Sequence, residues 1–96
     1  VGEEAVETLD KYNFTKGFWG TNGISVTKGF STPEVKEAMV KKHSIENCKK
    51  CYILADPSKF DQMSSVKFAD FDQATILTTG LLKPALKKYK NIVEVK

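Results

Sequence analysis

The 96-residue sequence contains no arginine, only two cysteines and no long hydrophobic run. Its 15 basic residues are all lysines and face 12 acidic residues, which leaves a net charge of +3. Arginine is the side chain best suited to bidentate recognition of guanine and phosphate, so the chain is a poor candidate for direct DNA contact. A membrane span needs about 18 apolar residues, and the acidic start, residues 1–7, is unlike a signal peptide. We therefore expect a cytoplasmic protein with no membrane partner.

Cys48 and Cys51 are too few for a disulfide framework in a chain that can build a core. They are expected to lie between a helix end and a strand, whereas a redox dithiol usually opens a helix. Zinc requires four ligands, and His43 with the two thiols supplies three. We expect ordinary reduced cysteines, no metal and no cofactor, with a redox or zinc module as the alternative.

The length supports one small domain with a modest core, because a chain of this size buries roughly 60 to 65% of its unfolded surface. No repeat or low-complexity tract interrupts it. The first residue, Val1, is not a methionine. We therefore expect the chain to be a piece of a longer protein.

Apolar spacing predicts an alternation of helices and strands. Helices are expected at residues 3–12, 33–47 and 84–89, and strands at 14–20, 52–55, 74–78 and 92–95. The first two strands are expected to be buried, the second on both faces. Residues 60–72 are assigned no structure, with Val66, Phe68 and Phe71 as their anchors. This order is typical of an α/β domain with a largely parallel sheet flanked by helices.

The second helix carries its own start signal. A hydroxyl residue, Ser31 or Thr32, is expected to cap it, with Pro33 at its first position. Lys36, Lys41 and Lys42 are expected on its outer face.

Polar residues follow the first predicted strand, where ligands of parallel sheets bind. Gly20 and Gly23 permit close backbone approach, Thr21 and Asn22 offer hydrogen bonds, and the later helix start favours anions. The alternative is two turns and a cap, for which these residue types are typical. Trp19 belongs either to the core or to the wall of this pocket.

A second polar segment follows the strand at 52–55. Asp56 would accept hydrogen bonds from the hydroxyls of a polyol phosphate, while Ser58 and Lys59 would hold its phosphate. The alternative is a solvated turn with a local ion pair, a common and weakly stabilising feature.

Three segments together resemble the effector-sensing C-terminal domain of DeoR-family bacterial transcription regulators. They are FWGTNGI at 18–24, GFSTP at 29–33 followed by Glu37, and LADPSKF at 54–60. The resemblance covers nearly the whole chain in the same order and spacing. It implies the Rossmann-like α/β fold of ribose-5-phosphate isomerase, glucosamine-6-phosphate deaminase and the coenzyme A transferases, truncated at the N-terminus.

In such regulators, the resemblance implies, this fold binds a phosphorylated sugar and changes the DNA affinity of an N-terminal winged helix-turn-helix. Residues 1–96 would be the C-terminal portion of the sensor domain, and operator DNA would be contacted only through the missing domain. A homo-oligomer is expected. Residues 21–24 and 29–33 look most like fructose-operon repressors of Gram-positive bacteria, which points to fructose 1-phosphate.

Carried over by position, the resemblance places Asn22 on the sugar and matches residues 56–59 to the family's Asp-x-Ser-Lys element. Lys28 and Glu37 fall where the isomerase relatives have a lysine and a catalytic glutamate. The loop at 20–23 lacks the carboxylates of those isomerases, so we expect a binding site without a catalytic residue. The expected ligand-binding residues are Gly20, Thr21, Asn22, Gly23, Lys28, Glu37, Asp56, Ser58 and Lys59. The alternative is a fragment of a sugar-phosphate isomerase or deaminase that uses Glu37 as its base.

Overall fold

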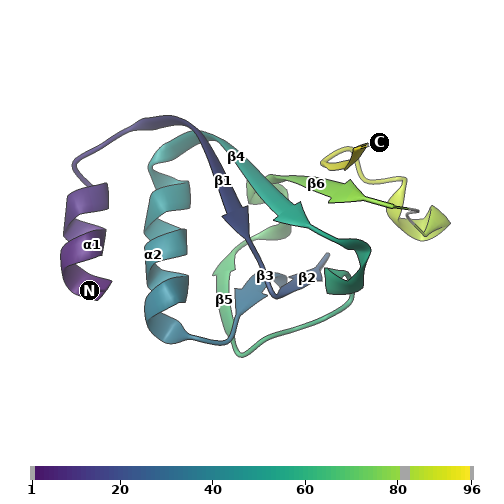
Figure 1. Cartoon of the computed structure of the whole chain (residues 1–96), viewed down its shortest axis with the longest axis horizontal. Helices are drawn as coiled ribbons and strands as arrows, with labels where there is room; N and C mark the ends of the chain where they lie inside the picture. Colours follow the sequence, from purple (N-terminus) through teal and green to yellow (C-terminus); the bar gives the residue numbers. More distant parts are fainter. Residues whose placement is uncertain (1, 81–82, 96) are drawn as a thin grey trace.

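Four parallel strands form the main sheet of the computed structural model, which describes residues 2–80 and 83–95 (Figure 1). Their order is β1 (Phe14–Gly20), β4 (Cys48–Ala55), β6 (Thr75–Thr79) and β7 (Ile92–Val95). All three pairings are parallel, so the carboxyl ends of the strands share one edge of the sheet. The prediction of an α/β domain with a largely parallel sheet is confirmed.

A small antiparallel sheet packs beside the main one and was not predicted. It joins β2 (Gly23–Ser25), β3 (Gly29–Thr32) and β5 (Val66–Ala69) in that order. The alternative of two turns and a cap within residues 20–32 is therefore wrong, because β2 and β3 lie there. Residues 60–72, to which the sequence analysis assigned no structure, contain β5. Segments of three or four residues are too short to show a hydrophobic period.

Two α-helices lie side by side at one end of the molecule (Figure 1). They are α1 (Gly2–Leu9) and α2 (Val35–Glu46), while short 3-10 turns occupy Pro57–Lys59, Phe71–Gln73 and Pro84–Leu86. The helix α2 contacts β3, β4 and β5, and α1 packs against α2. The helices predicted at 3–12 and 33–47 are confirmed by α1 and α2. The helix predicted at 84–89 is only the short 3-10 turn Pro84–Leu86.

The start of α2 differs from the prediction. Its cap is Glu34, whose carboxylate accepts a hydrogen bond of 2.6 Å from the backbone N–H of Glu37. Ser31 and Thr32 belong to β3 instead, because their backbone groups pair with β5. A carboxylate near a helix start is also favoured by the helix dipole, which explains why a hydroxyl cap is not needed.

The core lies between the main sheet, the small sheet and α2. Ile53 and Ile76 face it from the main sheet and are fully buried. From the small sheet, the ring of Phe30 stacks on Phe68 and Phe71 at centroid distances of 6.2 and 6.3 Å. The three anchors predicted in residues 60–72 all contact this core.

Trp19 is a core-facing residue. Its ring packs against the buried cluster, and its Nε1–H donates a hydrogen bond of 2.8 Å to Ser44 Oγ on α2. A Cβ atom added to Gly17 would collide with this ring. Trp19 therefore ties β1 to α2, and of its two predicted places the core is the one observed.

Thr78 gives a stability prediction, because its side chain is buried without a hydrogen bond. The residue is 1% exposed, and Oγ1 has no partner among the described residues. Thr78→Val keeps the shape and removes the desolvated hydroxyl, so we expect the free energy of unfolding to rise by about 1 kcal/mol. Urea denaturation measures it.

Thr32→Val is the matched control. Thr32 is equally buried, but its hydroxyl lies 3.3 Å from Asn22 Oδ1 and 3.4 Å from Glu37 Oε1. Its replacement should lower the free energy of unfolding by about 1 kcal/mol. A loss of the same size in Thr78→Val would show that the Thr78 hydroxyl has a partner after all.

Candidate functional site

The two predicted polar segments meet at the carboxyl edge of the main sheet. Gly20 pairs with Leu54 in the β1–β4 ladder, so the residues that follow each strand are neighbours. Further along, Ile24 bridges Phe60, and the backbone N–H of Asp61 donates to Ile24 O at 2.9 Å. Residues 20–24 and 54–61 therefore run side by side although they are far apart in the sequence.

Two of the four predicted residues in the first segment shape the loop. The buried Thr21 hydroxyl lies 2.9 Å from Gly23 O and 3.0 Å from Ser31 O. A Cβ atom added to Gly23 would lie 2.5 Å from Gln62 O, so only glycine allows this close approach. Gly20 and Asn22 are the exposed residues of the segment and are the ones placed to meet a ligand.

Asn22 joins a polar network at the first turns of α2. The Thr32 hydroxyl lies between Asn22 Oδ1 and Glu37 Oε1. Lys41 Nζ lies 2.9 Å from Glu37 Oε1 and donates a hydrogen bond of 2.9 Å to Gly20 O. This network fastens the end of β1 to α2.

Lys41 is the residue that the sequence prediction missed. It was expected on the outer face of α2, yet its side chain is only 16% exposed and its ammonium lies 5.2 Å from the centre of the Phe68 ring. Its position four residues after Glu37 is a signal for an ion pair on one helix face. The contact with Gly20, in contrast, is visible only in the fold.

Glu37 is poorly suited to act as a general base. The hydrogen bond and the charge of Lys41 hold the pKa of its carboxyl below the ordinary value. A general base works best with a pKa near the working pH, which requires the opposite shift. The site thus keeps Glu37 as an ionised partner of Lys41.

The second segment is organised by Asp56. Its Oδ1 accepts a 2.9 Å hydrogen bond from the Ser58 backbone N–H and another from the Ser58 hydroxyl. These bonds hold the pKa of Asp56 below its usual value. Both end on Oδ1, so Oδ2 remains the oxygen for a further donor.

Lys59 lies half-buried in the same turn, and its backbone N–H donates to Asp56 O at 3.2 Å. The alternative prediction placed it in a local ion pair with Asp56. Across residues 2–80 and 83–95 the structure holds four ion pairs, and none includes Lys59. Its ammonium is therefore not ion-paired within the described residues, although its charge makes a small contribution to the lowered pKa of Asp56.

Lys28 lies apart from the other predicted site residues. It sits in the turn between β2 and β3, where its backbone N–H donates to Ser25 Oγ at 3.0 Å. Gly23 pairs with Ser31 and Ser25 with Gly29, so Lys28 is at the far end of the hairpin from Asn22. Two residues of strand separate these ends by about 7 Å.

The cysteines were predicted to lie between a helix end and a strand, but both lie within the strand β4. Cys48 opens β4 and Cys51 lies inside it, because the ladder to β1 begins at Cys48. Both thiols are free and half-buried. Among the described residues no group of three or more histidine, cysteine or acidic side chains could hold a metal ion. The lone His43 lies 3.4 Å from Asp10.

Cys51 gives a prediction about thiol reactivity. Burial, with a smaller contribution from Cys48, raises the pKa of its thiol to about 11. Because only the thiolate reacts, we expect Cys51 in a Cys48→Ser variant to be alkylated about 100-fold more slowly at about pH 8 than a thiol of pKa about 8.5. The rate should rise as the pH approaches 11. A Cys51→Ser variant reports Cys48 alone, and ordinary reactivity of Cys51 near pH 8 would reopen the redox alternative.

No helix in the described part of the chain is long and apolar enough to cross a membrane.

Comparison with known proteins relates this chain to a family of sensors. A family model described as the DeoR C-terminal sensor domain matches residues 1–80. The chain is 40% identical over 96 residues to the uncharacterized HTH-type transcriptional regulator FruR of Bacillus subtilis. This alignment covers all of this chain and 38% of the length of FruR.

Two further regulators show similar agreement. The HTH-type transcriptional regulator IolR of Bacillus subtilis is 35% identical over 83% of this chain and 32% of its own length. The HTH-type transcriptional regulator GlpR of Haloferax volcanii is 34% identical over 82% of this chain and 31% of its own length. The chain thus spans about a third of the length of the curated relatives it matches.

Proposed function

The chain belongs to the family of DeoR C-terminal sensor domains, and we propose that it binds a sugar phosphate and so controls operator binding by a longer repressor. Its regulatory, effector-binding role follows from the family. In the proposal, residues 1–96 are the C-terminal portion of the sensor domain. A helix-turn-helix elsewhere in the polypeptide contacts DNA, and the repressor is a homo-oligomer.

One observation carries the proposal: the segments at 20–24 and 54–61 lie side by side at the carboxyl edge of the main sheet. Ligands of open α/β sheets bind at this edge because the loops after the strands converge there. The segments are also the ones that resemble the family in sequence. A ligand that touches both would be held between β1 and β4.

The side chains at this edge suit a phosphorylated polyol. The ammonium of Lys59 can bind the phosphate. The Ser58 hydroxyl can also donate to it, provided that its O–H turns away from Asp56 Oδ1. Asp56 Oδ2 and the exposed amide of Asn22 can bind hydroxyl groups of the sugar. Charge-assisted hydrogen bonds of this kind are the strong ones in binding sites. Lys28 is left out of the proposed site because of its place at the far end of the hairpin.

The proposed mechanism is a shift between two arrangements of the repressor. A ligand changes such an equilibrium only by its difference in affinity for the two states. Lys41 fastens Gly20 to α2, and α2 packs against α1. Ligand contacts at Asn22 and Lys59 can therefore reach the helices, and through them the subunit arrangement that sets operator affinity.

Fructose 1-phosphate is the proposed effector, since residues 21–24 and 29–33 look most like fructose-operon repressors. The test is a thermal shift of the full-length regulator with fructose 1-phosphate, fructose 6-phosphate and fructose. At about 100 times Kd, a ligand adds about 2.7 kcal/mol, which raises Tm by about 5 to 10 °C for a domain of 150 to 250 residues. If neither fructose 1-phosphate nor fructose 6-phosphate raised the Tm, the proposal would be contradicted.

The proposal assigns no catalysis to this site, in keeping with the lowered pKa of Glu37. Isomerisation of a sugar phosphate by the full-length protein, abolished in Glu37→Gln, would instead favour the enzyme alternative.

A further inference from the structure

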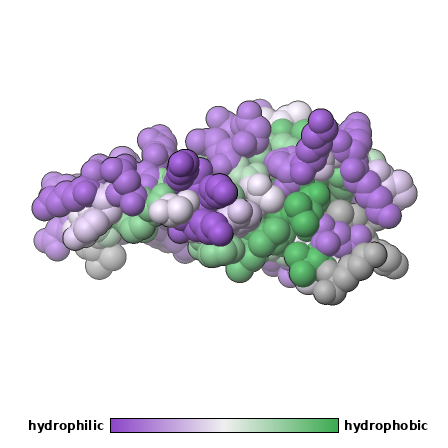
Figure 2. Space-filling view, turned by 90° about the horizontal axis from the view of Figure 1, so that it is seen from above, coloured by the Kyte–Doolittle hydropathy of each residue, from purple (hydrophilic) through white to green (hydrophobic). Residues whose placement is uncertain are grey.

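One face of the main sheet carries apolar side chains that the described chain leaves uncovered. The register of the strands places six of them together, and we call this set the open face. It consists of Phe18, Tyr52, Leu54, Leu77, Val93 and Val95. The exposed fractions of Phe18, Leu54, Val93 and Val95 are 58%, 51%, 42% and 45%. Figure 2 shows a hydrophobic area over the strand half of the molecule, whereas the helix end is mainly hydrophilic.

The open face has a shape that can receive a partner. The rings of Phe18 and Tyr52 stack at a centroid distance of 5.2 Å and form a ridge near β1. Beside it lies a cavity of about 490 Å³, lined by Leu54, Ala55, Asp56, Leu77, Thr79 and Val95. Large exposed apolar patches on a protein mark interaction surfaces.

The topology explains why this face is uncovered. The connection from β1 to β4 runs through the hairpin and α2, and that from β4 to β6 runs through β5. The residues of these connections pack into the core on the opposite face, as does Leu86 between β6 and β7. All-parallel sheets are covered by helices on both faces. The second cover must therefore come from outside the described residues.

We propose that the open face is covered by an amphipathic helix of the same polypeptide, from the part of the sensor domain that precedes Val1. This step rests on the proposed function, in which residues 1–96 are only part of the sensor. The relatives are long enough to contain such a segment, because this chain aligns with only 38% of the length of FruR. A helix of about 12 residues is about 18 Å long, which matches strands of five or six residues.

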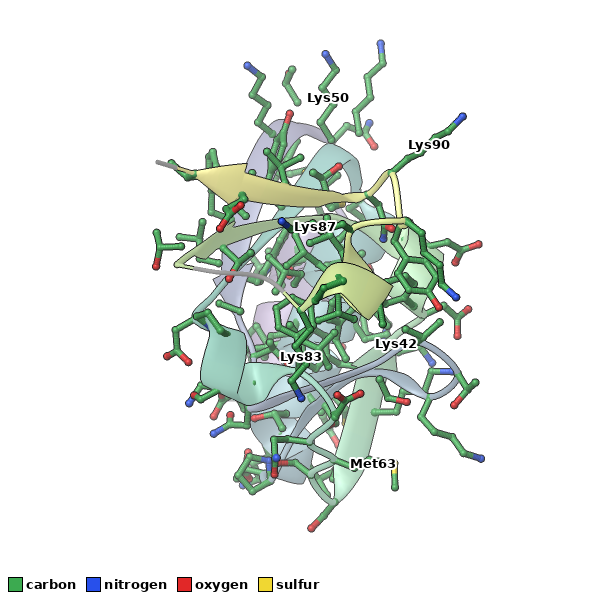
Figure 3. All side chains as sticks on the ribbon, turned by 90° about the vertical axis from the view of Figure 1, so that its right-hand side faces the viewer. Lys42, Lys50, Met63, Lys83, Lys87 and Lys90 are labelled. Carbon is green, nitrogen blue, oxygen red and sulfur yellow. The ribbon has the colours of Figure 1, made fainter. Side chains whose placement is uncertain are left out.

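Charge defines the expected helix further. Lys16 and Lys50 pair in the β1–β4 ladder at the amino end of the open face, and both are exposed. Lys50 extends away from the ribbon (Figure 3). The occupant is therefore a helix with an apolar stripe for the centre and acidic residues over these lysines. At the other end, Asp56 lines both the cavity and the proposed effector segment, so the helix would end beside the effector.

Thiol protection in the full-length regulator tests the inference. In a background with Cys48→Ser and Cys51→Ser, single cysteines are placed on the open face by Leu54→Cys or Val93→Cys. Met63→Cys is the control, because Met63 is 68% exposed and lies at the opposite end of the molecule from Lys50 (Figure 3). We expect labelling by a maleimide to be at least about 10-fold slower on the open face than at the control, at every protein concentration.

Two results would overturn the inference. Equal labelling at all three positions would show that the open face is uncovered, and protection lost on dilution would show that a second copy covers it. Hydroxyl-radical footprinting of Phe18 and Tyr52 in the unsubstituted protein repeats the test if a variant fails to fold. Neither measurement uses an effector. Protection of the open face is therefore measured separately from sugar-phosphate binding, and the failure of one proposal can be distinguished from the failure of the other.

Discussion

Replacement of Gly29 by alanine is expected to lower the free energy of unfolding by about 3 kcal/mol. Gly29 has a φ of +83°, in the left-handed region that costs other residues about 1 to 2 kcal/mol. An added Cβ would also collide with the carbonyl oxygen of Ala69 on β5. The backbone of β5 cannot move away without breaking its ladder to β3, and such overpacking costs about 1 to 3 kcal/mol.

Gly20→Ala is the control for this substitution. Gly20 lies at the exposed end of β1, and an added Cβ would meet nothing within 4 Å. The free energy of unfolding of the Gly20→Ala variant should differ from that of the unsubstituted protein by less than about 0.5 kcal/mol. Urea denaturation of both variants measures the difference. Equal stability of the two would contradict the structure of the β2–β3 hairpin, because the close approach of Gly29 to Ala69 would then be absent.

Lys59→Ala is expected to weaken binding of the sugar phosphate by about 10- to 100-fold, since a hydrogen bond to a charged group contributes about 1.5 to 3 kcal/mol. Lys59 is in no ion pair among the described residues, and its charge makes only the smallest contribution to the lowered pKa of Asp56. The loss should therefore appear in affinity and not in stability. Calorimetric titration of the full-length regulator measures it.

Lys28→Ala is the matched control for Lys59→Ala. It removes the same charge from the chain but at the far end of the hairpin, so affinity should change less than about twofold after correction for screening. An unchanged affinity in Lys59→Ala would remove Lys59 from the site. Equal losses in both variants would indicate attraction by overall charge and not a defined phosphate contact.

Several features of the fold could be predicted because they depend on local patterns. The apolar spacing in residues 3–12 and 33–47 marks the helices, and short apolar runs mark the four strands of the main sheet. The order of these elements implies a parallel sheet, since strands separated by helices cannot pair as hairpins. The family resemblance follows from the same linear segments.

The failures share a different cause. The strands at 14–20 and 52–55 were predicted to be buried, yet Phe18 and Leu54 are exposed. A run such as residues 52–55 is hydrophobic whether one face or two is covered. The number of covered faces depends on the other segments that pack against the strand, and the residues of the strand do not specify those segments. Lys41 was placed outside for a related reason, since its contact with Gly20 O joins α2 to a distant strand.

The sequence by itself determined the two polar segments of the candidate site, the α/β class and the family. These are properties of residue type and spacing along the chain. Only the tertiary structure decided that β1 lies next to β4, which brings residues 20–24 against 54–61. It also showed that Thr21 and Gly23 shape the loop while Asn22 is exposed. Strand order and burial are set by long-range packing, which no local pattern records.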